Sequence, residues 1–416
     1  MSLFTNSKSF VIKSLALTVT ALMVSTTQAA TDSAEIQQLR AEVQELKSLL
    51  QQQQQVQQQQ QVRLAEVAAQ PQASSPLAGL KSKSGADINI YGFVRGDANY
   101  IIEGADDDFN KVAATTGEAE DKLRATAKTT RIGLDFSTPA GDSKVGGKVE
   151  VDFAGNGASE NLRIRHAYLT YNNWLFGQTT SNFLSSHAPE MIDFSTNAGG
   201  GTTRIPQVRY AYNLAPSTKL LVAAEEGNSA GTSIKYSLPV LTAKVAHTYA
   251  NSKGTVSGRA LVENYKSSAA DNDKTGWGVA LGTDFKVIDP LKVFADASYV
   301  VGNSNYLYAS NNAFSVVDGD IEQNEFTAIQ VGATYKILPN LRSTLAYGTV
   351  LADDGTDFAK ANQTANEKIK QAWFNVIYSP VKPIDLGIEY INGKRETFAG
   401  QSYKDNRVGL MAKYNF

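Results

Sequence analysis

The residues best suited to bind a solute are arginines. They recur on one side of segments in which polar and apolar residues alternate. Six lie between residues 95 and 209 and one lies further along the chain, namely Arg95, Arg131, Arg163, Arg165, Arg204, Arg209 and Arg342. Guanidinium groups at successive depths offer paired hydrogen bonds to carboxylates, and rings of Arg and Lys favour anions. The alternative is that these charges only keep an interior wet and pair with nearby acids, namely Asp97, Asp135, Glu150 and Asp152. The pattern predicts a wall that binds anionic groups.

Other side chains suited to catalysis are scarce. The three histidines, His166, His187 and His247, do not have the spacing of metal ligands. His247 falls on the side of its segment that is expected to face outward, and no serine motif accompanies it. The chain has no cysteine, which excludes a thiolate nucleophile, a disulfide and a cysteine-ligated metal. The sequence therefore predicts no catalytic residue, no metal and no cofactor.

The end of the chain shows what kind of element carries the arginines. From Arg407 to Phe416 every second residue is apolar, namely Val408, Leu410, Ala412, Tyr414 and Phe416. This period of two is that of a β-strand with one apolar face, and it recurs in segments of about 8 to 13 residues. A closing strand that ends on phenylalanine is typical of outer-membrane β-barrels. The alternative is an edge strand of a soluble β-sandwich.

The connections between these segments alternate between two kinds. Short turns are expected at Pro139–Asp142, Asn172–Asn173, Ala215–Ser217, Leu238–Val240, Ile288–Pro290, Leu338–Asn340 and Ser379–Val381. Longer polar loops are expected at Glu103–Lys122, Ser181–Thr203, Asn251–Lys274, Gly302–Asn324, Ala352–Glu367 and Asn392–Lys404, with two brief ones near Gly155 and Gly227. Regular alternation of this kind predicts an all-β fold, a transmembrane antiparallel β-barrel of about 16 strands. A barrel of that size leaves an aqueous channel.

The loop from Ser181 to Thr203 contains apolar residues that a solvent-facing loop would not favour, among them Phe183 and Phe194. It also carries the acids Glu190 and Asp193. We expect this loop to fold inward and narrow the channel. Its acids would then lie opposite the arginines of the wall and create an electric field across the channel. The alternative is an external cap that packs on neighbouring loops.

The N-terminal part predicts export and a separate helical segment. Residues 1–30 have the basic start, short apolar run and small-residue site of a signal peptide. Apolar residues three and four apart predict an α-helical coiled coil over residues 31–68, although its glutamine tract is of a kind that is often disordered. Residues 69–86 read as a flexible linker and residues 87–416 as the barrel. The formal net charge of −2 argues against nucleic acid as a partner.

The order of these features resembles the DcaP-like trimeric porins of Gram-negative bacteria. The resemblance rests on the coiled-coil segment and on INIYGFVRGDANY (residues 88–100), TRIGLDF (130–136), RIRHAYLTY (163–171), IPQVRYAYN (205–213) and KYNF (413–416). It implies a homotrimer of sixteen-stranded barrels in outer-membrane lipid, with an inward third loop. It also implies uptake of small anionic solutes, aliphatic and aromatic dicarboxylates among them. The arginines named above rest on their strand parity alone.

The sequence therefore predicts a passive outer-membrane porin for small anionic solutes, with its coiled coil in the periplasm. One alternative is a general diffusion porin without a binding site. Another is a structural protein whose coiled coil tethers the outer membrane to the cell wall or to a periplasmic partner, with the barrel as its anchor.

Overall fold

The computed structural model describes residues 80–155, 160–270 and 272–416. The predicted signal peptide, the predicted coiled coil and most of the predicted linker lie outside the described residues, so this division of the chain stays a prediction. No helix in the described part is long and apolar enough to cross a membrane.

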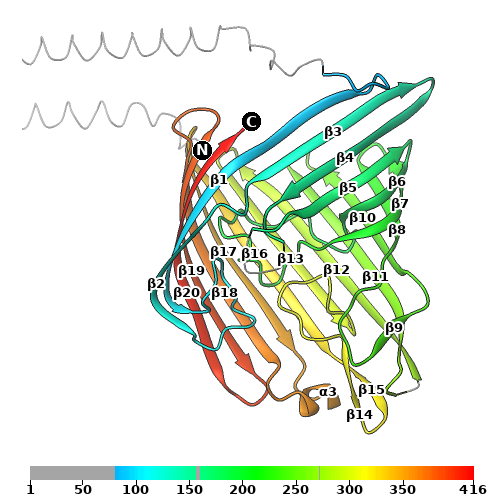
Figure 1. Ribbon diagram of the computed structural model, residues 1–416, viewed down its shortest axis with the longest axis vertical. Helices are drawn as coiled ribbons and strands as arrows, with labels where there is room; N and C mark the ends of the chain where they lie inside the picture. The colour runs from blue at the N-terminus through cyan, green and yellow to red at the C-terminus, as the bar shows by residue number, and fades with distance from the viewer. Residues whose placement is uncertain (1–79, 156–159, 271) are drawn as a thin grey trace, which may run out of the picture. The chain divides into compact units, whose positions relative to one another are not determined.

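The regular secondary structure of the described chain is almost entirely β-strand (Figure 1). Its first strands are β1 (Asp87–Gly104), β2 (Ala119–Thr126), β3 (Arg131–Ala140), β4 (Ser143–Asp152), β5 (Arg163–Tyr171), β6 (Trp174–Thr180), β7 (Arg204–Ala215), β8 (Thr218–Glu225), β9 (Ile234–Tyr236) and β10 (Val240–Tyr249). The wall continues with β11 (Gly254–Ser267), β12 (Asn272–Ile288), β13 (Leu291–Val301), β16 (Glu325–Leu338), β17 (Leu341–Ala352), β18 (Asn366–Tyr378), β19 (Ile384–Thr397) and β20 (Ser402–Asn415). A hairpin of β14 (Phe314–Val317) and β15 (Asp320–Gln323) and the short helix α3 (Asp357–Ala361) lie in the connections.

These strands close into an antiparallel barrel. β1 pairs with β20 from Phe93↔Asn415 onward, which joins the two ends of the sheet. Two wall strands are interrupted: β2 and β3 both pair with β1, and β9 and β10 both pair with β11. The 18 strands of the sheet therefore form sixteen wall strands, and the fold predicted from the sequence is confirmed.

The connections separate the barrel into two ends. We call the end with the short connections, such as residues 141–142, 172–173 and 216–217, the turn end, and the opposite end the loop end. Two expected connections were wrong. Leu238–Val240 lies at the loop end between β9 and β10, and most of Asn251–Lys274 belongs to β11 and β12. The outward side of β11 carries the small residues Gly258 and Ala260, so its sequence lacks the apolar stripe that marks its neighbours.

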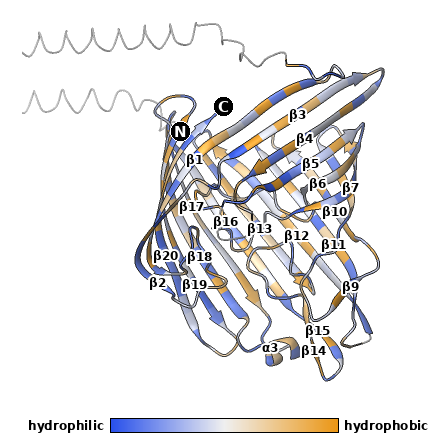
Figure 2. Cartoon of the chain, viewed as in Figure 1, coloured by the Kyte–Doolittle hydropathy of each residue, from blue (hydrophilic) through white to orange (hydrophobic). Residues whose placement is uncertain are grey.

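Most wall strands turn apolar side chains outward and polar or small ones inward. Leu281 and Leu345 are 62% and 63% exposed, whereas the adjacent Ala280 and Ala346 are buried. The alternation is visible along the strands in Figure 2. An apolar outer surface of this kind fits a lipid environment.

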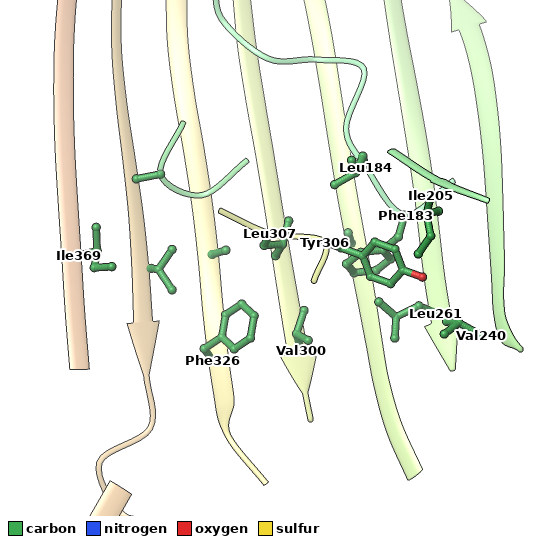
Figure 3. Packing of buried hydrophobic residues seen from close by; sticks show 14 of the residues in the cluster. Phe183, Leu184, Ile205, Val240, Leu261, Val300, Tyr306, Leu307, Phe326 and Ile369 are labelled. Atoms are coloured by element: carbon green, nitrogen blue, oxygen red, sulfur yellow. The ribbon is translucent and has the colours of Figure 1, made fainter. Parts of the chain in front are cut away.

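A hydrophobic core, here called the lumen core, fills part of the interior toward the loop end (Figure 3). Three inward-folded connections contribute to it: loop 1 (residues 105–118), loop 3 (residues 181–203) and loop 6 (residues 302–324). They supply Val112, Phe183, Leu184, Tyr306 and Leu307. The wall supplies Ile205, Val240, Leu261, Ala280, Val300, Phe326, Ala328, Val350 and Ile369, which belong to strands between β7 and β18. Burying each large apolar side chain contributes about 1.5–3 kcal/mol, which offsets the cost of ordering these loops.

Candidate functional site

Loop 3 follows the inside of the wall over much of its circumference. Asn182 N donates to Glu225 Oε1 of β8 at 3.0 Å, and Lys244 Nζ of β10 donates to the Leu184 carbonyl at 2.7 Å. Further hydrogen bonds join loop 3 to β11, β12, β13, β16, β17, β18 and β19. On β1, Arg95 donates to the Ile192 carbonyl of the loop. The partners are inward-facing side chains, so loop 3 lies inside the barrel. The external cap considered from the sequence is therefore wrong.

The four loop residues singled out from the sequence have different surroundings. Phe183 is fully buried in the lumen core, and Phe194 is 38% exposed, with the Arg95 guanidinium 4.4 Å from its ring centre. Both oxygens of Glu190 accept hydrogen bonds from Arg342 at 2.7 Å.

Asp193 accepts from the backbone N–H groups of Asn110 and Ser195 at 2.7 and 2.8 Å. Burial raises the pKa of this loop carboxyl to about 6. Asp193 and Glu190 thus attach loop 3 to loop 1 and to the wall. They do not stand free opposite the arginines, as the transverse-field hypothesis expected, because each is already used by a nearer partner.

One glycine allows loop 3 to lie directly on the wall. A Cβ atom at Gly348 of β17 would overlap the carbonyl oxygen of Ala198. Gln371 of the next strand accepts a hydrogen bond from Ala198 N at 3.0 Å. The loop backbone is therefore held at a fixed distance from β17 and β18.

The opposite part of the wall carries a group of arginines, here called the arginine cluster: Arg131, Arg163, Arg165 and Arg204. Arg165 lies at its centre and donates to Glu150 Oε1 at 2.8 Å and to Asp152 Oδ2 at 2.7 Å.

The other members share the same two acids. Arg163 also holds Asp152, through hydrogen bonds of 2.9 and 2.7 Å. Arg131 Nε lies 3.4 Å from Glu150 Oε1. Tyr91 donates to the second oxygen of Glu150 at 2.8 Å, which fixes the carboxylate.

The cluster has more positive charge than its acids balance. Arg204 interacts electrostatically with the other three arginines, and its Nε is buried without a hydrogen-bond partner. The Nε of Arg131 also lacks a hydrogen bond. Arg163 keeps 45% of its side chain exposed. Four guanidinium groups around two carboxylates leave a formal excess of two positive charges, which favours an anion nearby.

Loop 3 is not hydrogen-bonded to this part of the wall. In the described residues it forms no hydrogen bond or ion pair with β3 to β6, and the centre of its Phe194 ring lies 5.8 Å from the Arg131 guanidinium. The arginine cluster therefore lies on the part of the wall to which loop 3 is not fastened.

Comparison with known proteins places the chain in a family. The model of the DcaP outer membrane protein family matches residues 20–416. The chain belongs to the DcaP outer membrane protein family. None of the curated proteins compared with it matches.

Solved structures show the same architecture. The outer membrane channel DcaP of Acinetobacter baumannii is 71% identical, with a TM-score of 0.80, over 82% of this chain and all of that chain. An anion-selective porin from Comamonas acidovorans is 12% identical, with a TM-score of 0.55, over 80% of this chain and all of that chain. OmpT of Vibrio cholerae without its loop L8 is 16% identical, with a TM-score of 0.54, over 80% of this chain and 99% of that chain. The family and the first of these relatives are outer-membrane proteins that form channels, and this chain is an outer-membrane β-barrel channel of the same kind.

Three arginines named from the sequence lie apart from the arginine cluster. Arg95 donates hydrogen bonds to Asp97 and to the Ile192 carbonyl, and it therefore holds loop 3 against β1. Arg342 is occupied by Glu190. In the described residues the Arg209 side chain makes a single hydrogen bond, at 3.5 Å to Asn182 Oδ1. It lies nearer the turn end than Arg204 because β7 runs in that direction.

One contact of loop 3 has the atoms of a hydrolytic triad. His187 Nδ1 lies 2.8 Å from Asp284 Oδ2, and His187 Nε2 lies 2.9 Å from Ser257 Oγ. A nucleophile must be reachable by its substrate, but Ser257 is 1% exposed and His187 is 2% exposed. The trio fastens loop 3 to β11 and β12. Of the solved structures named above, the Acinetobacter baumannii protein is a channel and the Comamonas acidovorans protein is a porin.

No metal site is found in the described residues: no group of three or more His, Asp or Glu side chains is placed to hold a metal ion.

Sequence reasoning missed Arg259, which donates to Asp296 at 2.6 and 2.7 Å and to the Phe183 carbonyl at 3.1 Å. It had been assigned to a loop. The only signal was its alternation with Ser257 and Glu263 on the inward side of β11. Alternating polar residues are weak evidence for a wall strand when the outward residues between them are small.

Proposed function

We propose that this channel passes small anionic solutes, and dicarboxylates in particular, with the arginine cluster as the binding route. The observation that carries the proposal is the unbalanced set of four arginines on the part of the wall to which loop 3 is not hydrogen-bonded. The solute gradient supplies the driving force, and the wall lowers the cost of bringing an anion out of bulk water.

The geometry favours a solute with two carboxylates. Arg131 and Arg204 lie on two different strands, and both interact electrostatically with Arg165 and Glu150 between them. A solute with two anionic ends engages separate guanidinium groups, whereas chloride engages one at a time. Conduction also needs weak binding, and the resident acids Glu150 and Asp152 keep the cluster from holding a solute too tightly.

The test is the current through purified protein in planar bilayers. In a KCl gradient the reversal potential should show preference for anions, and succinate or phthalate on one side should block the current in proportion to its concentration. Arg204→Gln and Arg165→Ala should weaken the block about tenfold, the loss expected for one charge-assisted contact. Arg124→Gln is the matched control, since Arg124 forms ion pairs with Asp106 and Asp108 at the edge of loop 1.

The other readings predict different currents. A general diffusion porin would conduct without block by either diacid. A barrel that serves only as an anchor for a tether would not conduct. Preference for cations would contradict the proposal outright.

We also infer that the turn end faces the periplasm. Short periplasmic turns and long external loops are the arrangement of outer-membrane barrels. β1 begins and β20 ends at the turn end, so the predicted coiled coil of residues 31–68 would then enter from the periplasm. Protease added to intact cells should cleave a tag inserted after Gly319 in the β14–β15 turn, and should leave a tag in the turn at residues 141–142 untouched.

We further infer a homotrimer. On the outer wall, β1, β2, β19 and β20 border a mostly apolar hollow of about 770 Å³, whose lining includes the small residues Gly96, Ala98, Ala125 and Ala412. Small side chains allow two protein surfaces to approach closely, and the family resemblance points to three copies. Ala98→Trp should shift the mass of the detergent-solubilised protein from trimer to monomer in light scattering, while Leu281→Trp on the far wall should not. An unchanged trimer in Ala98→Trp would place the interface elsewhere.

A further inference from the structure

A second cavity lies inside the barrel at the turn end, between β5 and β8. Its volume is about 300 Å³, which is at the lower end of the range for small-molecule sites. Arg209 and Lys219 line it together with the polar residues Thr170 and Asn213. No acid is among its lining residues. We call it the Arg209–Lys219 pocket.

Neither cation of this pocket forms an ion pair in the described residues, although Glu225 of β8 acts electrostatically on Arg209 from a greater distance. The side chain of the partly buried Arg209 makes one hydrogen bond in this part of the chain, the 3.5 Å contact with Asn182. Lys219 is exposed to the interior, and the described residues provide no ion pair for it. Elsewhere in the lumen the arrangement is different, since Arg95, Arg259 and Arg407 each have an acid within 2.5–2.8 Å.

A structural role does not account for the pair. A guanidinium withdrawn from water is costly unless it is paired, and Arg209 holds loop 3 only by a long bond to a neutral amide. The lining also includes Leu175 and Leu221. A cavity with two cations that form no ion pair in the described residues, neutral hydrogen-bonding groups and an apolar side fits a solute that has a hydrocarbon body and an anionic end.

We propose that the Arg209–Lys219 pocket is a second anion site, which takes a carboxylate end of the solute on the turn-end side of the arginine cluster. The inference rests on the proposed function, because it concerns the same class of solute. Arg204 and Arg209 are five residues apart on β7, which corresponds to roughly 17 Å along a strand. A small dicarboxylate cannot span that distance, so the two sites are occupied one after the other.

The pocket makes a prediction about direction. A solute that enters from the turn end meets the Arg209–Lys219 pocket before the arginine cluster. A solute that enters from the loop end has the arginine cluster available first. Removing a cation of the pocket should therefore weaken the block of the current by a solute added at the turn end more than the block by a solute added at the loop end.

The experiment is single-channel block by phthalate in planar bilayers, with the protein inserted in one orientation and phthalate added to either side. In Lys219→Gln the half-blocking concentration should rise at least about fivefold from the turn end and less than about twofold from the loop end. Arg209→Gln should behave alike, and Arg209→Lys should restore part of the block.

Lys336→Gln is the matched control. Lys336 lines a different turn-end cavity, between β12 and β16, that also contains Glu190 and Asp289. The variant removes the same charge from the same end of the lumen, and its half-blocking concentrations should stay within about twofold of the unmodified protein.

The outcomes separate this inference from the proposed function. Equal shifts in Lys219→Gln and Lys336→Gln, or equal shifts from both sides, would mean that only the general charge of the lumen matters and would overturn the pocket. If Arg204→Gln weakens the block and Lys219→Gln has no effect, the pocket fails and the arginine cluster stands. If phthalate does not block the unmodified protein from either side, the proposed function itself fails.

Discussion

Replacing Glu150 by glutamine should tighten the binding of a dicarboxylate to the arginine cluster. Glu150 Oε1 accepts from Arg165 Nε at 2.8 Å and lies 3.4 Å from Arg131 Nε, so it competes with a solute carboxylate for the same donors. Glutamine keeps the shape of the side chain but has a single acceptor oxygen, which can stay on Arg165 while its NH2 group donates to the Tyr91 hydroxyl oxygen. The substitution thus removes the negative charge and reverses one hydrogen bond.

The size of the effect follows from the charges. A solute carboxylate bound between Arg131 and Arg165 would lie about 5 Å from that of Glu150, where two unit charges repel by about 3 kcal/mol at an effective dielectric constant of about 20. Water and mobile ions in the lumen screen part of this repulsion. If about half remains, the gain is about 1.5 kcal/mol, or roughly tenfold in affinity.

The assay is the concentration of succinate that blocks half of the current, measured at low and at high KCl. In Glu150→Gln this concentration should fall about tenfold at low salt and by less at about 1 M KCl, where the screening length is short. Glu263→Gln is the control, because Glu263 is a buried acid of β11 whose hydrogen-bond partners in the described residues are Ser229, Tyr236 and Asn303, all distant from the arginine cluster along the wall. An unchanged or higher half-blocking concentration in Glu150→Gln would refute the idea that this acid competes with the solute.

Three further predictions concern loop 3. Gly348→Ala places a Cβ on the Ala198 carbonyl, so it should lower the free energy of unfolding by about 1–3 kcal/mol and alter the conductance. Gly258→Ala places its Cβ in open space and should change neither quantity. Heat-dependent mobility in gels measures the stability, and single-channel currents measure the conductance. Arg342→Gln breaks the paired hydrogen bonds to Glu190 and should increase open-channel current noise. Burial raises the pKa of Asp193 to about 6, so the folded state keeps a proton that the unfolded state releases near pH 4. The stability that this proton confers on the folded state is therefore complete below about pH 4 and is lost as the pH rises through about 6. Hydrogen exchange of loop 1 between pH 4 and 7 should show this dependence, and Asp193→Asn should abolish it.

The number of wall strands could be predicted because lipid imposes a simple rule on the outer face. Residues such as Leu281 and Leu345 must be apolar, and short turns with Pro or Asn separate their strands. The rule failed at β11, where Gly258 and Ala260 occupy outward positions. It failed again at Pro239, which interrupts a strand at the loop end instead of making a turn. The total stayed at sixteen because the two errors compensated.

The candidate site was predictable in part. Strand parity identified the residues that face inward, including Arg131 and Arg165. It could not show which of them are free, because their partners come from distant parts of the chain. Arg342 is bound by Glu190, which is 152 positions away, and Arg95 by a carbonyl 97 positions away. The Arg209–Lys219 pocket was missed for the same reason, since an absence of acids around a cation is a property of the folded wall.

The lumen core has a consequence for how such a channel changes over generations. On the side of β7 to β18, the inner face of the wall is packed against loops, so a substitution there disturbs many neighbours at once. On the side of β3 to β6, the inward side chains bond mainly to one another, as Arg165 does to Glu150 and Asp152, so an exchanged side chain there disturbs few contacts with the described loops. The residues that hold the loops in place are thus largely distinct from those that we propose to meet the solute. Substitutions in the arginine cluster could therefore change the proposed solute preference while the lumen core stays the same.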